Sequence, residues 1–305
     1  MNTSDKVAVC SRSFSRNPIL REELLARYQQ VTFNEEGIQF AGDSLIAFLQ
    51  NHDKAIIALE PIDEATLLYL PKLKVISKYG VGLDSIDMDA IQRLGIRFSW
   101  TGGVNSRSVS ELVLCFAIAL LRHVPRVTSE VLAGKWQQRT GNLLSGRTVG
   151  IIGCSYVGKD LVRLLQPFGC QILVYDIKID GEFCAQYGVT AMTLDELLTR
   201  SDIVSLHVAL NESTRLMLSA ERLKMMKSTA ILINTARGGL VDEFALKNRL
   251  QLGQLAAAGF DVFMNEPPED QELLALSNFY ATPHIGGSTE EAIISMGRAA
   301  INGLD

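Results

Sequence analysis

Short apolar runs and longer amphipathic segments follow one another along the whole chain. The apolar runs, rich in β-branched residues, predict strands at 7–11, 55–59, 74–78, 96–100, 148–153, 171–176, 203–208, 230–235, 257–262 and 279–283. Segments of helical periodicity lie between many of them, for example ELLARYQQ and EFALKNRLQLG. The runs are continuously apolar, as expected for parallel strands that helices cover on both faces. The pattern therefore predicts an α/β fold.

The length of the chain and one glycine-containing turn divide this pattern into two domains. A chain of 305 residues is longer than one hydrophobic core usually supports. The stretch GIIGCSYVG, Gly150–Gly158, joins a predicted strand to a predicted helix only after several strand–helix units. The polar segment WTGGVNSRS at 100–108 precedes this second series. We therefore expect one α/β domain that ends near residue 100 and a second that runs to residue 283.

Composition and charge narrow the class of protein. Hydrophobic residues make up 47% of the chain and charged residues 21%, and the net charge of −5 arises from interspersed signs. A nucleic-acid partner would require a basic face, so none is expected. The longest apolar run, Leu112–Leu121, is about half the length of a membrane-spanning helix. With no basic leader before an apolar segment at the N-terminus, we expect no membrane association.

The cysteines indicate the redox compartment. There are five, at positions 10, 115, 154, 170 and 184, and no pair has the C-x-x-C spacing. Neither a zinc site nor a disulfide framework is predicted from such a distribution. We expect a reduced, cytoplasmic protein without a bound metal.

The turn at Gly150–Gly158 carries two of the three glycines of the dinucleotide-binding pattern G-x-G-x-x-G. Gly153 would permit the tight turn and Gly158 the close packing of strand and helix, whereas Ser155 stands where the backbone approaches the pyrophosphate. The next predicted strand ends in Asp176, 23 residues after Gly153, where the pattern expects an acid for the ribose 2′-hydroxyl. Because this carboxylate would repel a 2′-phosphate, NAD is favoured over NADP. A glycine-rich turn with a purely structural role is the alternative.

Five motifs together resemble those of a known enzyme family. The motifs, in chain order, are SKYGVGLDSID at 77–87, GRTVGIIGCSYVG at 146–158, INTARGGLVDE at 233–243, DVFMNEPP at 261–268 and TPHIGGST at 282–289. In this order and spacing the sequence resembles the D-isomer-specific 2-hydroxyacid dehydrogenases. The resemblance implies two doubly wound parallel-sheet domains. A Rossmann NAD-binding domain at 101–283 would be inserted into a flavodoxin-like substrate domain formed by 1–100 and 284–305.

The resemblance also implies the catalytic residues. The family's catalytic arginine falls on Arg237, its glutamate on Glu266 and its acid/base histidine on His284. Reduction of a 2-oxo acid to the D-2-hydroxy acid develops negative charge on the keto oxygen, where a cation and a proton donor are needed. The planar guanidinium of Arg237 could bind both the carboxylate and the keto oxygen. His284 would donate the proton, with Glu266 stabilising the imidazolium.

The binding residues follow from the same resemblance. The backbone loop that receives the substrate carboxylate falls on Tyr79, Gly80, Val81 and Gly82. The cofactor contacts fall on Gly153, Ser155, Tyr156, Val157, Gly158, Asp176, Val208, Thr235, Ala236, Asp261 and Gly286, with Asp261 on the nicotinamide side. His207 is interpreted as structural or as lining the cofactor crevice. A homodimer joined through the cofactor domain, usual in the family, is expected too.

The substrate and the activity itself leave alternatives open. Phosphoglycerate dehydrogenases of the family place an arginine after the strand at 55–59, but here Leu59 and Glu60 follow. This counts against phosphoglycerate dehydrogenase proper. Arg12 or Arg16 could bind a distal anionic group of the substrate, unless both are ordinary solvated arginines. A catalytically silent NAD-binding scaffold, like the corepressors of this family, is the last alternative, although such a scaffold would not need the acid–base pair.

Overall fold

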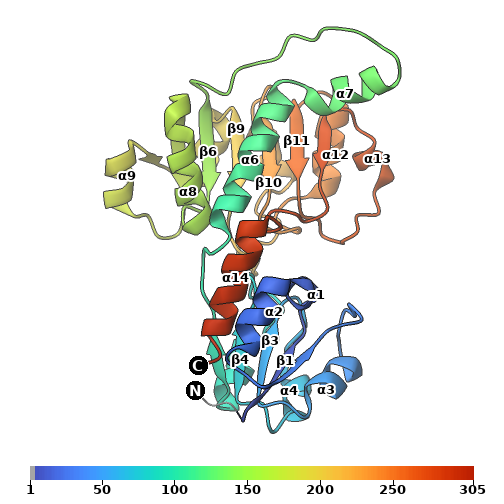
Figure 1. The fold of residues 1–305 in the computed structure, drawn as a ribbon. Helices are drawn as coiled ribbons and strands as arrows, with labels where there is room; N and C mark the ends of the chain where they lie inside the picture. The colour runs from blue at the N-terminus through green and yellow to red at the C-terminus, as the bar shows by residue number, and fades with distance from the viewer. Residues whose placement is uncertain (1–3) are drawn as a thin grey trace. The chain divides into compact units, whose positions relative to one another are not determined.

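The structure, a computed structural model, describes residues 4–305 and divides into two compact units. The first contains the residues up to Asn105 together with Gly287–Asp305, and the second contains Ser106–Gly286. The boundaries expected from the sequence, at 100 and 283, fall a few residues earlier. Each unit is built on one parallel sheet (Figure 1).

The first unit has a five-stranded sheet in the order β2-β1-β3-β4-β5, in which all neighbouring strands are parallel. Its strands are β1 (Lys6–Val9), β2 (Gln30–Phe33), β3 (Lys54–Ile57), β4 (Val75–Lys78) and β5 (Arg97–Ser99). Its helices are α1 (Arg12–Arg16), α2 (Pro18–Leu25), α3 (Asp43–Leu49), α4 (Glu64–Leu68), α5 (Met88–Arg93) and α14 (Glu290–Asn302). This is the strand order of flavodoxin-like folds.

Both faces of this sheet are buried, because successive side chains of a strand point to opposite faces. On β1, Val7 and Val9 belong to the cluster that includes residues of α1, α2 and α14. Ala8, between them, belongs to the cluster that includes residues of α3, α4 and α5. Two helical layers therefore enclose the sheet, which explains why its strands are continuously apolar in sequence.

Helix α14 belongs to the first unit although it lies at the C-terminal end of the chain. Thr289 caps its start by accepting a hydrogen bond from the backbone N–H of Ala292. Met296 and Ala300 are buried in the core of the unit. A Cβ added to Gly297 would lie 2.3 Å from Cδ1 of Leu20 in α2, so only glycine permits this close approach of the two helices.

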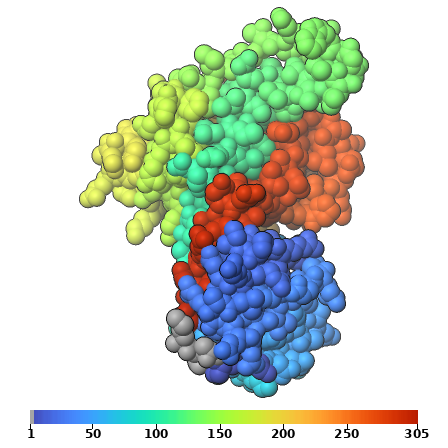
Figure 2. Space-filling model, viewed as in Figure 1, coloured from blue at the N-terminus to red at the C-terminus, as the bar shows by residue number. Residues whose placement is uncertain are grey.

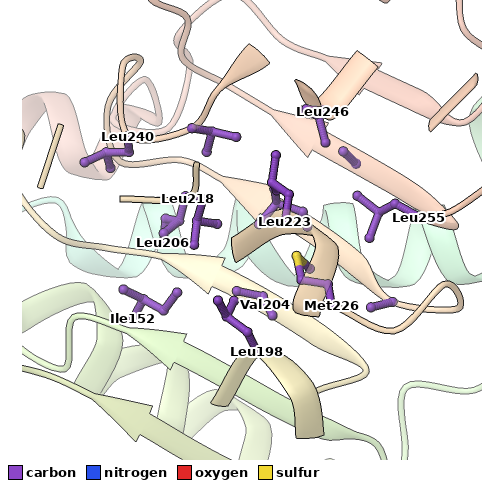
Figure 3. Close-up of a cluster of buried hydrophobic side chains, with 14 of the residues drawn as sticks. Ile152, Leu198, Val204, Leu206, Leu218, Leu223, Met226, Leu240, Leu246 and Leu255 are labelled. Atoms are coloured by element: carbon purple, nitrogen blue, oxygen red, sulfur yellow. The ribbon is translucent and has the colours of Figure 1, made fainter. Parts of the chain in front are cut away.

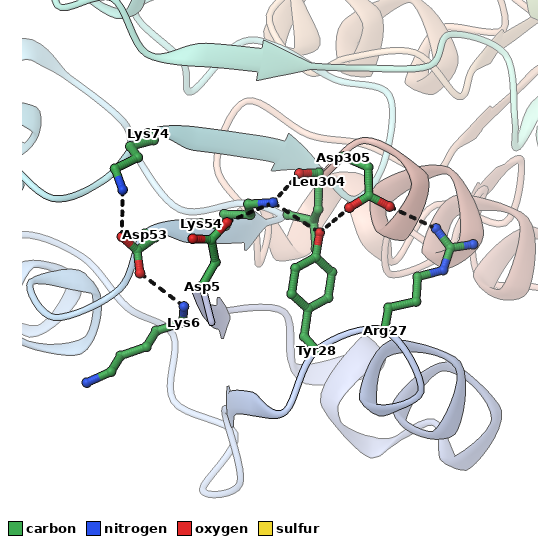
Figure 4. Close-up of polar contacts among 9 residues, drawn as sticks. All are labelled: Asp5, Lys6, Arg27, Tyr28, Asp53, Lys54, Lys74, Leu304 and Asp305. Carbon is green, nitrogen blue, oxygen red and sulfur yellow. Dashed lines mark hydrogen bonds and ion pairs between the residues drawn. The ribbon is translucent and has the colours of Figure 1, made fainter. Parts of the chain in front are cut away.

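A polar network lies at the amino-terminal edge of the first sheet (Figure 4). The Lys54 ammonium, at the start of β3, lies 3.2 Å from a carboxylate oxygen of Asp5 and donates to the carbonyl of Leu304 at 2.8 Å and to the hydroxyl of Tyr28 at 3.1 Å. The Tyr28 hydroxyl in turn donates to Asp305. Burial, and then the contact with Asp305, raise the pKa of Tyr28 well above its ordinary value. The network ties the end of α14 to the sheet.

The second unit has a seven-stranded parallel sheet in the order β12-β11-β10-β9-β6-β7-β8. Its strands are β6 (Thr148–Ile152), β7 (Gln171–Tyr175), β8 (Thr190–Ala191), β9 (Ile203–Leu206), β10 (Ile231–Asn234), β11 (Ala257–Phe260) and β12 (Phe279–Ala281). Its helices are α6 (Ser106–Leu121), α7 (Val124–Leu132), α8 (Tyr156–Leu165), the 3₁₀ turn η1 (Gln166–Phe168), α9 (Gly181–Tyr187), α10 (Leu194–Arg200), α11 (Ala220–Met225), α12 (Glu243–Gln251) and α13 (Gln271–Leu274). Counted from β8, this is the Rossmann order with one strand added at the edge.

The two cores of the second unit lie on opposite faces of this sheet. Ile151 faces the cluster formed with α6 and α8, whereas Ile152 faces the cluster formed with α10, α11 and α12. Figure 3 shows the second cluster, in which Val204 and Leu206 of β9 lie among leucines of the covering helices. Both predictions of fold class, the α/β class and two parallel-sheet domains, are confirmed.

Two strands were not predicted, and both carry a weak apolar signal. In β2, Phe33 is the only buried residue of the four, and β8 is two exposed residues long. Such edge strands bury one face at most, so the sequence shows no continuous apolar run.

The longest apolar run lies in helix α6, in the core of the second unit. Phe116 and Leu120 are buried there, whereas α7 has no buried residue. No single helix within residues 4–305 is long and apolar enough to span a membrane; α6 and α7 meet that requirement only as a pair, bent by 63° between them.

Candidate active site

The carboxyl-terminal edge of the seven-stranded sheet gathers the site residues predicted in the second unit. All strands of a parallel sheet end at the same edge, so the loops that follow them are neighbours. The predicted residues follow β6 (Gly153, Ser155, Tyr156, Val157, Gly158), β7 (Asp176), β9 (Val208), β10 (Thr235, Ala236, Arg237), β11 (Asp261, Glu266) and β12 (His284, Gly286). Strands β6 and β9 are adjacent at the point where the strand order reverses, which is where ligands bind in such sheets.

The turn after β6 is closed by two glycines that no other residue could replace without movement. Gly153 has φ of 94°, and an added Cβ would lie 2.8 Å from the carbonyl carbon of His207. A Cβ on Gly158 would lie 2.2 Å from the carbonyl oxygen of Gly153. Ser155 is exposed, and its φ of −95°, with ψ of −126°, lies outside the left-handed region that favours glycine. The substitution at the middle position is therefore compatible with the fold of the turn.

Asp176 lies beside this turn and is held by two backbone N–H groups. Its Oδ2 accepts from Cys154 at 2.6 Å, and its Oδ1 accepts from Lys178 at 3.0 Å. Burial raises the pKa of the Cys154 thiol to about 11, so this side chain stays protonated at neutral pH. The carboxylate is thus fixed at the end of β7, next to the turn.

His207, between β9 and Val208, is a neutral residue of the edge. Its ring Nε2 lies 2.9 Å from Oγ of Ser205, and its backbone N–H donates to the carbonyl of Ile152 at 2.7 Å. Burial lowers the pKa of the imidazole to about 3. A histidine with this pKa does not exchange protons near neutral pH, so His207 is not a candidate acid or base.

Two features of this edge fit a dinucleotide. Gly153 and Gly158 keep the turn tight, and the turn leads directly into the N-terminus of α8, the place where a pyrophosphate binds in such folds. The hydroxyl of Thr235, after β10, is buried and has no hydrogen-bond partner within residues 4–305. Buried polar groups are almost always paired, so this hydroxyl indicates a ligand that supplies the partner.

The loop that carries Arg237 is fixed by the side chain of Asn234. The Asn234 amide donates to the carbonyl of Arg237 at 2.8 Å, and its oxygen accepts from the N–H of Ala236 at 3.1 Å. Gly238 lies flat against the next loop, since an added Cβ would come within 1.9 Å of the backbone of Phe263. The loops after β10 and β11 are therefore in direct backbone contact.

Glu266 and His284 form a hydrogen-bonded pair across the loops after β11 and β12. Oε2 of Glu266 lies 2.8 Å from Nδ1 of His284, and Oε1 accepts from the N–H of Phe263 at 3.1 Å. Their side chains remain 38% and 44% exposed, so both can be reached from solvent. His284 has φ of 54°, and its N–H donates to the carbonyl of Asp261 at 2.9 Å. The backbone of His284 thus has a left-handed conformation that residues other than glycine rarely adopt, and such conformations occur at functional sites.

Asp261 organises the loop of His284 from inside the protein. It is 1% exposed, and its carboxylate accepts from the hydroxyl of Thr282 and from the N–H groups of Ile285 at 2.8 Å and Gly286 at 2.7 Å. A buried carboxylate is stabilised only when such donors surround it. The residue that the sequence assigned to the nicotinamide side is thus also a clamp on the histidine loop.

In the first unit, the predicted substrate loop follows β4. Tyr79 is buried, its hydroxyl accepts from Oγ of Ser13 at 3.0 Å, and burial raises the pKa of the phenol. Gly80 has φ of 106°, a conformation open to glycine. Val81 and Gly82 are half-buried. The loop therefore combines a fixed ring with a backbone left accessible.

The charged residues near this loop are arranged in a way that the sequence did not predict. Glu60 is buried and accepts from the N–H of Ala58 at 2.5 Å, while the ammonium of Lys78 donates to the carbonyl of Ala58. A buried acid and a buried cation thus bind the backbone N–H and the backbone carbonyl of one residue, Ala58, and Leu59 is exposed at 66%. Glu60 is a structural acid rather than a charge directed to solvent.

Arg12 and Arg16 lie on α1, on either side of Ser13, and both are exposed. The guanidinium of Arg16 lies over Gly37, where an added Cβ would be 2.6 Å from it. Helix α1 therefore contributes one residue to the hydroxyl of Tyr79 and presents two cations nearby along the same helix.

Three residues of the site were missed by the sequence: Asn234, Gly238 and Glu243. All lie inside the motif INTARGGLVDE. Asn234 binds the backbone of its own loop, whereas Gly238 and Glu243 contact the backbone of the loop after β11, and spacing reveals neither kind of contact. Within residues 4–305, no group of three or more His, Cys, Asp or Glu side chains is placed to hold a metal ion.

Comparisons with known proteins identify the family of this chain. A sequence model described as the NAD binding domain of D-isomer specific 2-hydroxyacid dehydrogenases matches residues 114–286. The hydroxypyruvate reductase of Thermotoga maritima is 37% identical over 275 residues, which cover 86% of this chain and 89% of the relative. The D-3-phosphoglycerate dehydrogenase of Methanocaldococcus jannaschii is 41% identical over 224 residues, which cover 72% of this chain and 43% of the relative.

The fold matches solved structures over nearly its whole length. The crystal structure of a glyoxylate reductase from Paecilomyes thermophila has a TM-score of 0.87 and 27% identity, covering 98% of this chain and 94% of that chain. The chain thus spans most of two reductases but less than half of the archaeal phosphoglycerate dehydrogenase. It belongs to the D-isomer specific 2-hydroxyacid dehydrogenases and is an NAD-dependent oxidoreductase.

Proposed function

We propose that this protein reduces a small 2-oxo acid to the D-2-hydroxy acid with NADH, and that Arg237, Glu266 and His284 carry the reaction. The observation that supports the proposal most directly is the distance of 2.8 Å between Oε2 of Glu266 and Nδ1 of His284. A carboxylate that accepts from Nδ1 fixes the tautomer and leaves Nε2 to exchange a proton with the substrate.

In this mechanism each residue answers one requirement of the reaction. NADH, when bound, supplies the hydride to the keto carbon. Arg237 binds the substrate through its planar guanidinium and stabilises the charge that develops on the keto oxygen. His284 donates the proton to that oxygen, and Glu266 stabilises the imidazolium before the transfer. Tyr79–Gly82 offers backbone N–H groups to the substrate carboxylate.

The cofactor would be held by the edge of the second sheet. We assign the pyrophosphate to the turn at Gly153–Gly158, the adenosine ribose to Asp176 and a hydrogen bond of the cofactor to the buried hydroxyl of Thr235. The support for this assignment is the cradle formed by the two glycines and the unpartnered hydroxyl.

The substrate class we favour is an unphosphorylated 2-oxo acid such as glyoxylate or hydroxypyruvate. The residues after β3 are an exposed leucine, Leu59, and a buried acid, Glu60, so this stretch offers no cation to a phosphate. The names of the Thermotoga relative and of the Paecilomyes structure support the same class. Arg12 or Arg16 would bind a distal anionic group if the acid carries one; unchanged kcat/KM in Arg12→Ala and Arg16→Ala on every accepted acid would remove that part of the proposal.

The experiment that tests the proposed function has two stages. NADH binding is first measured by fluorescence titration, and NADH consumption is then followed with glyoxylate, hydroxypyruvate and 3-phosphohydroxypyruvate, with chiral analysis of the product. We expect binding, turnover of the first two acids above the third, and a D-product. NADH binding without turnover on a broad panel would favour a silent scaffold, and preference for the phosphorylated acid would favour phosphoglycerate dehydrogenase.

We propose in addition that the protein acts as a homodimer through the segment 124–147, green in Figure 2. Helix α7 in this segment has no buried residue, and two large apolar side chains of the segment, Leu132 and Trp136, are 84% and 88% exposed. Large apolar side chains exposed to this degree are typical of a contact surface. Light scattering on the protein and on Leu132→Asp should give a dimer and a monomer respectively; a monomeric parent protein would contradict the proposal.

A further inference from the structure

Two carboxylates hold successive peptides of the loop after β11: Glu266 binds the Val262–Phe263 peptide and Glu243 binds the Phe263–Met264 peptide. Oε1 of Glu266 accepts from the N–H of Phe263 at 3.1 Å, and Oε1 of Glu243 accepts from the N–H of Met264 at 2.9 Å. Glu266 is part of the pair with His284, whereas Glu243 lies at the start of helix α12. Two successive N–H groups of one short loop are thus bound by an acid of the loop itself, Glu266, and by an acid of helix α12, Glu243.

The Phe263–Met264 peptide is the point where the loop of Arg237 meets the loop of Glu266. An added Cβ on Gly238 would lie 1.9 Å from the carbonyl carbon and oxygen of Phe263 and 2.4 Å from the nitrogen of Met264. The residue after Arg237 therefore rests on the peptide that Glu243 holds, one peptide after the one that Glu266 holds. A displacement of this peptide would move Glu266 relative to Arg237.

The backbone of Glu243 is fixed by the start of helix α12. Glu243 is the first residue of the helix, and the preceding Asp242 caps it by accepting from the N–H of Ala245 at 2.9 Å. Through its hydrogen bond to Met264, the side chain of Glu243 thus links the loop after β11 to the start of a capped helix.

Burial and the neighbouring charges disfavour the ionised form of Glu243. Burial raises the pKa of Glu243, the neighbouring carboxylates of Asp270 and Glu266 raise it further, and only the bond from Met264 lowers it. The nearby cation, Lys247, is bound to Asp270 at 2.8 Å and to Glu272 at 3.1 Å. Because its pKa is raised in the folded state, ionised Glu243 reduces stability at neutral pH. An acid in this place is better explained by what its hydrogen bond positions than by stability.

We propose that Glu243 is a positioning residue for the reaction: it holds the Phe263–Met264 peptide against Gly238 and so fixes Glu266, and with it His284, relative to Arg237. The inference rests on the proposed function of these three residues. A glutamine would keep the acceptor oxygen and remove the charge, whereas an alanine would remove both.

The test compares Glu243→Ala with Glu243→Gln, and uses Glu272→Ala as a control because Glu272 is an exposed acid on α13 that contacts Lys247 instead of the loop. Steady-state reduction of glyoxylate and hydroxypyruvate gives kcat and KM, and NMR hydrogen exchange reports the Met264 amide. We expect Glu243→Ala to lower kcat by about 10–100-fold, the scale of a small misplacement of reacting groups, with KM changed little. Glu243→Gln should restore kcat to within a few-fold and should be at least as thermally stable as the parent protein.

Exchange at Met264 should be faster in Glu243→Ala than in the parent protein, and unchanged in Glu243→Gln and Glu272→Ala. Parental kcat together with parental exchange in Glu243→Ala would overturn the proposal, as would a Glu243→Gln variant as impaired as Glu243→Ala. If Glu243→Ala proves partly unfolded, the kcat of Glu243→Gln and the Met264 exchange rate in the folded fraction of Glu243→Ala still test the proposal. Absence of turnover in the parent protein would refute the proposed function, and the Met264 exchange would still show whether Glu243 holds the peptide.

Discussion

The carboxyl-terminal edges of the two sheets are built in different ways. In the second unit, side-chain oxygens of Asn234, Asp261 and Glu266 accept hydrogen bonds from backbone N–H groups of the loops that carry the reactive residues. In the first unit, the loop after β4 is held by the phenol of Tyr79 and by the indole of Trp100, which donates to the carbonyl of Val81 at 3.1 Å. Charged groups bind the backbone of the neighbouring Ala58.

The difference indicates what each edge has to place. Proton and charge transfer depend on the position of side chains to within a fraction of an ångström, and such positions require loops that are clamped at several points. A carboxylate can be bound by backbone N–H groups, for which a glycine-containing loop is sufficient. We therefore expect substitutions in the second unit to act on kcat and substitutions in the first to act on KM.

The largest effect is expected from Arg237→Met. Loss of the guanidinium removes the charge that faces the developing oxyanion, and kcat/KM should fall by about 10²–10³-fold, the usual effect of losing one such donor. Arg222→Met is the matched control, because Arg222 forms an exposed ion pair with Asp195 on the surface of the same unit. Steady-state kinetics with glyoxylate check both variants; equal kcat/KM in the two would break the comparison.

Gly238→Ala tests the contact between the two loops of the second unit. The added Cβ would lie 1.9 Å from the backbone of Phe263, so one loop must move. We expect a loss of about 1–3 kcal/mol in the free energy of unfolding, the range for overpacking, together with a lower kcat. Gly181→Ala, which meets no atom within 4 Å, should leave both unchanged. A Gly238→Ala enzyme with the parental kcat would show that the loop contact is not needed for turnover.

Tyr79→Phe tests the first unit. The substitution removes the hydrogen bond from Ser13, which is worth about 0.5–1.5 kcal/mol, and we expect KM for the 2-oxo acid to rise a few-fold while kcat is nearly unchanged. Ser13→Ala should have the same effect, and the double variant should be no worse than either single one. A fall in kcat at constant KM would contradict the division of labour between the two edges.

The smallest effect is expected from Ser155→Gly. Ser155 is exposed and its backbone already has an ordinary φ, so the substitution changes the approach of the pyrophosphate more than the fold of the turn. NADH should bind a few-fold more tightly in fluorescence titration. An unchanged Kd would make Ser155 a neutral replacement for the glycine.

The sequence predicted the elements of this fold well where they are buried on both faces. Strands such as β6 and β9 have continuous apolar runs because helices cover them, whereas β2 was missed because three of its four residues are not buried. The glycine of the turn, Gly153, was predicted from its pattern, and the structure adds the physical reason, its contact with His207.

The supports of the site could not be predicted in the same way. Asn234, Gly238 and Glu243 act through contacts with backbone that lies in other loops or several residues away, and no residue type or spacing specifies such a contact. Asp261 was assigned to the cofactor, and its role in clamping the loop of His284 became visible only from its three donors. The assignment of the reactive groups therefore comes from the sequence and stays a prediction, and the structure shows which side chains hold the loops that carry them.

The most direct test of the central claim is the behaviour of His284→Gln in paired measurements of NADH binding and turnover. If His284 is the proton donor, the Kd for NADH should stay within a few-fold of the parental value. The kcat for glyoxylate or hydroxypyruvate should fall by about 10²–10⁴-fold, the contribution of general acid–base catalysis. Retention of the parental kcat in His284→Gln would contradict the account, because the reaction would then take its proton from another group.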